Sequence, residues 1–169
     1  MLFAVSATLI AQTSKADIYA EEAYQKRIVK EYLHGVYIPR DLSDAFVQFN
    51  KLIDKATIVK FKNLPEDQAD RRLHFGFGKW ISHNYNFFEG SRFSAFLNNL
   101  GLYHPDDMIT FVIITYHRNI NRNKLDVKLL LDKLIKNREA IIQARKLEGE
   151  VISSEKRKLE VHPDSLKQN

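Results

Sequence analysis

The chain has 169 residues, of which 44% are hydrophobic and 28% are charged, and its formal net charge is +5. This composition is typical of a globular domain that is long enough to bury a hydrophobic core. Because the chain contains no cysteine, disulfide frameworks, thiol catalysis and cysteine-ligated metal sites are excluded. The positive charges are interleaved with Asp and Glu along the chain, so the net charge gives no strong indication of nucleic-acid binding.

The beginning of the chain differs from the rest in composition. Residues 2–11 form an uncharged apolar run that has the length of a signal-peptide core and is too short to cross a bilayer. Ser14 and Ala16 then provide the small residues expected at positions −3 and −1 of a cleavage site. This pattern predicts a signal peptide over residues 1–16 and a periplasmic or secreted mature chain. A short buried N-terminal helix in a cytoplasmic protein is the alternative interpretation.

From residue 17 onward the spacing of apolar residues is helical nearly throughout. It predicts an all-α fold, namely one compact, bundle-like domain of about six helices over residues 17–147. A charged tail over residues 148–169, either helical or disordered, is expected to follow. Helices are expected at residues 20–33, 41–55, 65–81, 92–100, 105–118 and 126–147, with a short turn at residues 58–64.

Specific residues mark the helix ends in the centre of the chain. Ser91 can accept backbone N–H groups as the cap of a helix, and Gly101 can take the left-handed conformation that closes it. Pro105, with two aspartates behind it, is typical of a first helical turn. The β-branched run over residues 112–115 is therefore predicted to belong to a central apolar helix rather than to a strand.

The order of several motifs resembles a known family. The motifs are YIPRDLSDAF, LHFGFGKWISHNY, EGSRF, LGLYHPDDM and ITYHRNIN. Together they resemble a family of uncharacterised bacterial proteins that is known only as a domain of unknown function, over about residues 36–127. The resemblance implies a small helical domain, sometimes behind a signal peptide, and it implies no activity. Tyr85 stands where the family pattern has tryptophan, so an aromatic role is kept but an indole-specific contact is not.

The segment over residues 74–118 is the expected place for a functional site. It contains four of the six histidines and the only tryptophan. The preferred interpretation is a non-enzymatic exported domain that binds a protein or a small anionic ligand, such as an accessory or immunity-type protein. We expect its site where the EGSR turn meets the start of the HPDDM helix. The candidate binding residues are Trp80, Asn84, Tyr85, Glu89, Arg92, His104 and Asp107.

Arg92 is the candidate for contacting an anion directly. It lies one position into a predicted helix and follows Glu89 closely. A guanidinium there can clamp a carboxylate or a phosphate through two parallel hydrogen bonds. The simpler alternative is an ion pair with Glu89 or with an aspartate of HPDDM, which would make the role of Arg92 structural.

A small hydrolase or a metal-dependent enzyme is the competing hypothesis. Its candidate residues are His74, His83, His104, Asp107 and His117. It requires at least two histidines and a carboxylate in one pocket. The aspartates that begin the HPDDM helix lie about 16 Å from His117 along the same helix, so they cannot form an acid–base pair with it.

The sequence shows no recognisable motif for a metal or a phosphate. His74 and His83 are nine residues apart, which matches neither HExxH nor an i, i+4 pair. We therefore expect no metal and no cofactor, with His74, His83 and His104 as the candidate ligands if a metal site exists. Gly76 and Gly78 form only a fragment of a phosphate loop, so close helix packing or a local kink is their expected role.

Overall fold

The computed structural model describes residues 15–160, with side chains as far as Glu148. The apolar run of the predicted signal peptide lies outside the described residues, and the predicted cleavage point after Ala16 falls in the first turn of the first helix. The elements are α1 (Lys15–Ile28), β1 (Tyr32–Leu33), β2 (Val36–Tyr37), α2 (Leu42–Leu52), α3 (Lys55–Lys62), α4 (Glu66–Leu73), the π-helical segment η1 (His74–Gly78), α5 (Lys79–Asn84), α6 (Arg92–Asn99), α7 (Pro105–Ile120) and α8 (Val127–Glu160).

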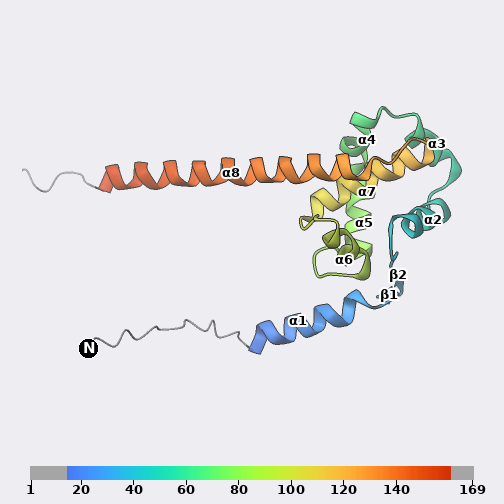
Figure 1. Ribbon diagram of the computed structural model, residues 1–169, viewed down its shortest axis with the longest axis horizontal. Helices are drawn as coiled ribbons and strands as arrows, with labels where there is room; N and C mark the ends of the chain where they lie inside the picture. Colours follow the sequence, from blue (N-terminus) through green and yellow to red (C-terminus); the bar gives the residue numbers. More distant parts are fainter. Residues whose placement is uncertain (1–14, 161–169) are drawn as a thin grey trace, which may run out of the picture. The chain divides into compact units, whose positions relative to one another are not determined.

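The predicted all-α fold is confirmed. Within residues 15–160 the regular structure is helical apart from one two-stranded hairpin (Figure 1). The described part of the chain has more helices than the six expected, for two reasons. The helix predicted over residues 65–81 is divided by the π-helical segment, and the turn expected at residues 58–64 overlaps the helix α3. None of the helices in residues 15–160 is both long enough and apolar enough to cross a membrane.

The described residues divide into two compact units, and the division lies between Asn123 and Lys124. It falls inside the range that the sequence predicts as one domain. The second unit contains α8, which continues without interruption to Glu160. The predicted boundary between domain and tail, after Leu147, therefore lies within a helix. Leu130 and Leu134 of α8 are buried, whereas the apolar residues near its middle are partly exposed.

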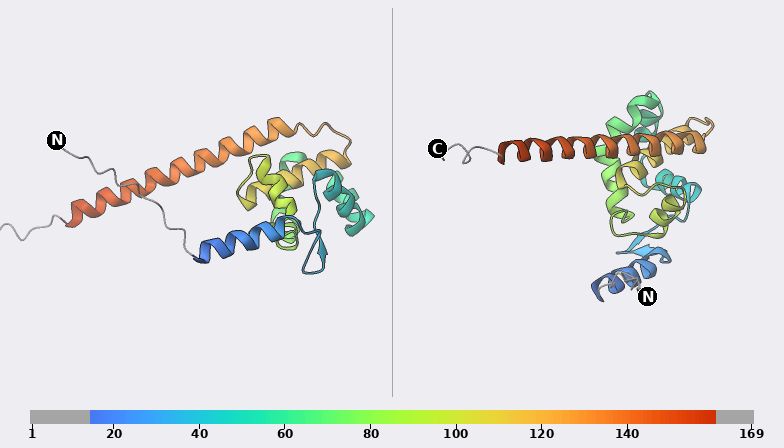
Figure 2. Two further views of the ribbon diagram at one scale, coloured as in Figure 1. Left: turned by 60° about the horizontal axis from the view of Figure 1, so that its bottom comes forward. Right: turned by 60° about the vertical axis from the view of Figure 1, so that its left-hand side comes forward.

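The prediction that the first helix extends to residue 33 is wrong. Helix α1 ends at Ile28, and a β-hairpin formed by β1 and β2 follows it (Figure 2). The two residues between its strands, His34 and Gly35, have φ values of 49° and 80°. Two successive left-handed residues form the turn that matches the twist of a tight hairpin. Across the strands, the rings of Tyr32 and Tyr37 meet edge to face with their centroids 5.4 Å apart, a favourable cross-strand pair.

Side-chain caps explain where the next two helices begin. Asp41 Oδ1 accepts a hydrogen bond from the Asp44 N–H at 2.9 Å, and Asp54 Oδ1 accepts one from the Thr57 N–H at 2.9 Å. The first cap is predicted by the sequence. The second divides the helix expected over residues 41–55, since α2 ends at Leu52 and α3 begins after the new cap.

The expected ends of α6 are confirmed. Ser91 caps the helix and forms a reciprocal capping box with Ser94. At the other end Gly101 has φ 93°. The Gly101 N–H donates to the Asn98 carbonyl at 2.9 Å and the Leu102 N–H donates to the Leu97 carbonyl at 3.1 Å. These two bonds define a Schellman motif, which satisfies the last carbonyl groups of the helix.

Helix α7 is the centre of the first unit, as the sequence predicts. It contacts α2, α3, α4, η1 and α5 (Figure 1). Its buried residues occur on nearly every side of the helix. Other parts of the protein, rather than water, therefore surround most of α7. The neighbouring helix α5 is less deeply buried than expected, because Ile81 is buried but Trp80 remains 37% exposed.

The close approach of η1 to α7 depends on Gly78. A Cβ atom added at this position would overlap the Cγ2 methyl group of Ile109 and would lie 3.4 Å from Cδ1 of Ile113. A Cβ atom added at Gly76 would have no such neighbour within 4 Å. Close packing, one of the two roles expected for these glycines, is therefore observed at Gly78. The π-helical geometry here is a local departure from the α-helix of a kind found often at functional sites.

We expect Gly78→Ala to lower the free energy of unfolding by about 1–3 kcal/mol, because the added methyl group forces α7 away from η1. Gly76→Ala adds the same group to the same π-helical segment without a steric conflict and should change stability by less than about 1 kcal/mol. Urea denaturation followed by circular dichroism would measure both. Equal effects of the two substitutions would contradict this explanation.

Candidate functional site

A hollow of about 340 Å³ lies beside the π-helical segment. Four parts of the first unit line it: η1, α5, the turn that follows α5, and the first turns of α7. We call it the histidine hollow. Its lining residues are His74, Phe75, Lys79, Ser82, His83, Phe88, Asp106 and Ile109. Two of the candidate histidines thus meet a carboxylate from the HPDDM motif.

His74 is held between two carboxylates. Its Nδ1 lies 3.1 Å from Asp70 Oδ1, one helical turn earlier, and its Nε2 lies 3.9 Å from Asp106 Oδ1. The second oxygen of Asp70 accepts a hydrogen bond from the Thr110 hydroxyl at 3.1 Å. Asp70 therefore links α4, η1 and α7 and sets the orientation of the imidazole ring. The i, i+4 spacing of Asp70 and His74 is a signal that the sequence contains.

A larger hollow, of about 510 Å³, adjoins the first. We call it the amide hollow because two asparagines line it. Its lining residues are Leu33, His34, Val36, Ser82, His83, Asn84, Asn86, Phe88 and Glu89. The two hollows share Ser82, His83 and Phe88. Phe88 is 75% exposed, as is Phe75 in the histidine hollow.

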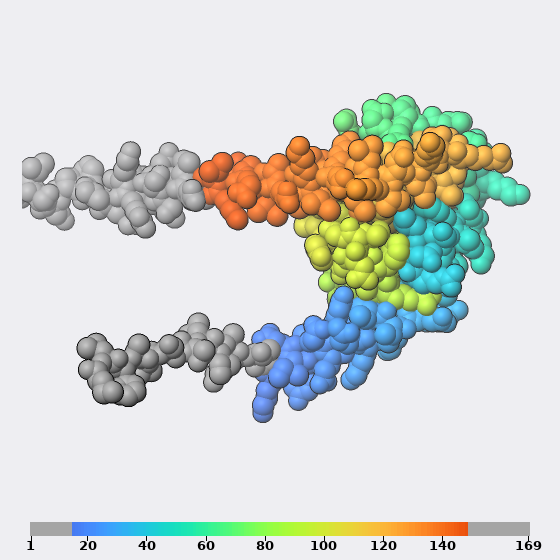
Figure 3. Space-filling model, viewed as in Figure 1, coloured from blue at the N-terminus to red at the C-terminus, as the bar shows by residue number. Residues whose placement is uncertain are grey.

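The turn between α5 and α6 lines the amide hollow. Helix α1 packs beside α6 (Figure 3) and reaches this turn through Arg27. Arg27 of α1 donates from Nε to the Glu89 carbonyl at 3.1 Å, and its Nη2 donates to the same oxygen. Asn86, with φ 51°, donates from its side chain to the Gly90 carbonyl at 3.3 Å. These bonds use the backbone of the turn and leave the Glu89 side chain exposed.

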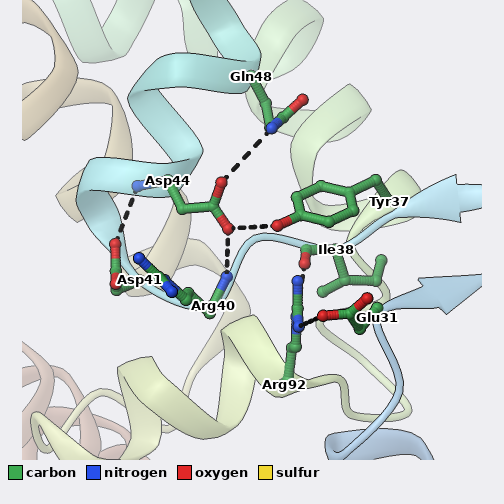
Figure 4. A network of polar contacts seen from close by, with 8 residues as sticks. All are labelled: Glu31, Tyr37, Ile38, Arg40, Asp41, Asp44, Gln48 and Arg92. Carbon is green, nitrogen blue, oxygen red and sulfur yellow. Dashed lines mark hydrogen bonds and ion pairs between the residues drawn. The ribbon is translucent and has the colours of Figure 1, made fainter.

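Arg92 pairs with neither of the partners expected from the sequence. Its Nε donates to the Ile38 carbonyl at 2.6 Å and its Nη1 to Glu31 Oε1 at 3.2 Å (Figure 4). The guanidinium carbon lies 5.0 Å from the centre of the Tyr37 ring, at cation–π distance. Arg92 therefore fastens the hairpin to α6. The sequence could not indicate this, because Glu31 lies 61 positions away.

Asp44 is the hub of the polar network beside Arg92 (Figure 4). It accepts from the Tyr37 hydroxyl at 2.8 Å and from the Arg40 N–H at 3.0 Å. Burial alone would raise the pKa of Asp44, but these hydrogen bonds, one from Gln48 and the charge of Arg92 together hold the pKa below its usual value. The hydrogen bond to Asp44 raises the pKa of Tyr37. The network joins β2 to α2.

Tyr85, one of the candidate binding residues, belongs to the core. It is almost completely buried, and its ring lies 5.8 Å from that of Phe93 and 6.1 Å from that of Phe49, centre to centre. Burial raises the pKa of its hydroxyl group. Trp80, edge-on to Tyr85, instead lines a separate hollow together with Gly76, the end of α2 and their neighbours.

The remaining candidates are placed as follows. Asn84 and Glu89 line the amide hollow. His104 caps α7, since its Nδ1 accepts from the Asp106 N–H at 3.2 Å, and Asp107 lies half-buried in the same first turn. His117 is buried at the other end of α7, where its Nε2 lies 2.9 Å from the Leu64 carbonyl.

This arrangement brings together only part of the proposed catalytic set. His74, His83 and Asp106 share a hollow, but His117 is in the core. The Ser82 hydroxyl group, a nucleophile that lines both hollows, is buried and donates to the Lys79 carbonyl at 3.1 Å. Within residues 15–160, no three His, Asp or Glu side chains are grouped so that they could hold a metal ion.

Reasoning from sequence did not single out several residues that line the hollows. They are Leu33, His34, Val36, Phe75, Lys79, Ser82, Asn86, Phe88 and Ile109. No sequence pattern marks them, since phenylalanines such as Phe75 and Phe88 are expected in a core and are instead exposed in the structure. The EGSR turn and the HPDDM helix contribute to different hollows, since Glu89 lines the amide hollow and Asp106 lines the histidine hollow. Phe88, just before the EGSR turn, lines both.

Comparison with known proteins gives one match. Residues 38–120, just under half of the chain, match a family described as a domain of unknown function (DUF6794). The match lies within the range in which the sequence resembles an uncharacterised family. No curated protein and no solved structure matches the chain. The matched segment contains every residue of the histidine hollow.

We expect Asp44→Asn to reduce the pH dependence of stability between about pH 5 and pH 2. A carboxyl group has a pKa of about 3.9 in an unfolded chain. Because the pKa of Asp44 is lower in the folded chain, its contribution is fully present above the unfolded value and is lost as the pH falls through the folded one. Thermal denaturation across this pH range would measure the slope. Asp132→Asn, at an exposed carboxyl group of α8, is the matched control and should leave the slope unchanged.

Proposed function

We propose that the protein is an exported bacterial binding domain and that its recognition site consists of the histidine hollow and the amide hollow. The observation that carries the proposal is the position of Phe88. Its ring lines both hollows and yet is 75% exposed. A ligand that covers it removes a large apolar surface from water, which is the usual energetic anchor of a recognition site.

The chemistry around Phe88 suits selective binding. Both hollows fall within the range of volumes typical of ligand sites, about 300–1,000 Å³. Each combines an exposed aromatic ring with several polar side chains whose positions are set by the fold. Asp70 orients the ring of His74, and backbone carbonyl groups hold the side chains of Asn84 and Asn86. Such pre-ordered groups lose little conformational entropy when a ligand binds.

Binding accounts for this geometry better than hydrolysis does. The Asp70–His74 pair resembles the carboxylate–histidine pair of a general base, and this is the observation that favours an enzyme. However, the nitrogen that would accept a proton, His74 Nε2, lies 3.9 Å from Asp106. A carboxylate at that distance stands where a substrate hydroxyl group or a water molecule would have to approach this nitrogen.

One prediction of this proposal concerns the binding site. A ligand-observed NMR screen with a fragment set containing anionic, cationic and neutral members should yield binders whose signal depends on Phe88. We expect Phe88→Ala to weaken these binders by about tenfold or more, as truncation of an aromatic anchor does. Val59→Ala, at another exposed apolar residue of the first unit, is the matched control. Binding that survives Phe88→Ala, or a complete lack of binders, would refute the proposed site.

Another prediction of this proposal concerns export. Expressed from its own start in a Gram-negative host, the chain should be found in the periplasmic fraction, and its intact mass should correspond to a mature form that begins at Asp17. Ala16→Tyr should prevent cleavage because a bulky side chain does not fit position −1. Ala20→Tyr is the matched control and should be processed normally. A full-length chain recovered from the cytoplasm would show that the protein is not exported.

A further inference from the structure

We infer that the amide hollow binds a cationic group, an ammonium or a guanidinium. This inference rests on the proposed function and adds the chemical class of the ligand. The first observation is the charge of the lining. Glu89 is the one lining residue with a full charge, and no Lys or Arg lines the hollow. The hollow is therefore acidic, although the chain as a whole carries a net charge of +5.

The second observation is the use of the hydrogen-bond donors. Asn84 Nδ2 donates to the Trp80 carbonyl at 2.8 Å, and Asn86 Nδ2 donates to the Gly90 carbonyl at 3.3 Å. The Ser82 hydroxyl donates to a backbone carbonyl as well. Each amide thus commits one of its two N–H groups to the protein and keeps the other N–H group together with its oxygen, which can accept two hydrogen bonds. Together with the Glu89 carboxylate, these groups give the hollow more acceptors than donors.

An anionic ligand would fit this lining poorly. Its oxygens would lie near the Glu89 carboxylate and the amide oxygens, and its own acceptors would lose water without gaining sufficient donors. Leaving buried polar groups without partners in this way costs free energy. A cation would instead be attracted by the opposite charge of Glu89, and its N–H groups would donate to the available oxygens. The inference therefore differs from the small anionic ligand expected from the sequence.

The imidazoles are compatible with either type of ligand. His34 lies in the hairpin turn and His83 near the end of α5, and each neutral ring offers one donor and one acceptor. Two cations lie close by but are already engaged. Arg27 is bonded to the Glu89 carbonyl, and the Lys79 ammonium lies 5.6 Å from the centre of the Phe75 ring in the histidine hollow.

The third observation is the aromatic wall. Phe88 offers an exposed ring beside the acceptors, and a cation over such a ring is attracted by the negative face of the π-system. The contact of Lys79 with Phe75 is an example of this interaction in the adjoining hollow. A cationic ligand in the amide hollow would thus be held by a carboxylate, by amide oxygens and by a ring face.

The test uses the full chain and two probes of nearly the same shape, acetyl-arginine amide and acetyl-citrulline amide, in which a carbonyl oxygen replaces one NH2 group and the charge is absent. Isothermal titration calorimetry should show the arginine probe binding at least about tenfold more tightly. Glu89→Gln should remove most of this difference. Glu22→Gln, at an exposed glutamate of α1, is the matched control and should preserve it.

The outcomes separate the two proposals. Equal binding of the two isosteric probes, or preferential binding of acetate or inorganic phosphate in a manner that requires Phe88, would overturn the cationic class and leave the binding site intact. If neither these probes nor any fragment binds in a manner that requires Phe88, both the class and the site are wrong. Preferential binding of a cation that Glu89→Gln does not weaken would place the cation elsewhere and overturn the inference.

Discussion

The close contact between Gly78 and α7 is the constraint on which the rest of the first unit depends. Because no side chain separates η1 from α7, Ile109 and Ile113 can pack directly against the backbone of the π-helical segment. The chain on either side of Gly78 then has its position set, with His74 before it and Lys79 after it. The polar residues of the histidine hollow are therefore placed by an apolar contact.

Many polar residues of the central segment serve the fold. Arg92 fastens the hairpin, His104 caps α7, and Arg118 holds Glu66 through two hydrogen bonds of 2.9 and 2.6 Å. Since buried and half-buried polar groups need partners, such residues are required for packing regardless of function. The proposed recognition site is a smaller set around Phe88. The family match covers this set only in part, because the hairpin residues Leu33 and Val36 precede the matched segment.

The two hollows have different chemical characters although they share a wall. The histidine hollow contains a lysine and an aspartate, so its fixed charges balance, whereas the amide hollow has an acceptor surplus and the single charge of Glu89. A ligand that spans both can therefore be selected by charge at one end and by shape at the other. Specificity of this kind arises from groups that the wrong ligand would leave without partners.

The sequence by itself determined the helical class, the caps at Asp41 and Ser91, the turn at Gly101 and the central place of α7. All of these follow from interactions between residues close together in the chain, which periodicity and capping rules describe. Only the tertiary structure decided which polar residues the fold uses and which remain for a ligand. The backbone carbonyl groups of Ile38 and Leu64, to which Arg92 and His117 bond, lie more than fifty positions away in the chain, and no local rule specifies such pairs. The same reason explains why Phe88, which no motif marks, becomes the centre of the proposed site only when the fold places it between two hollows.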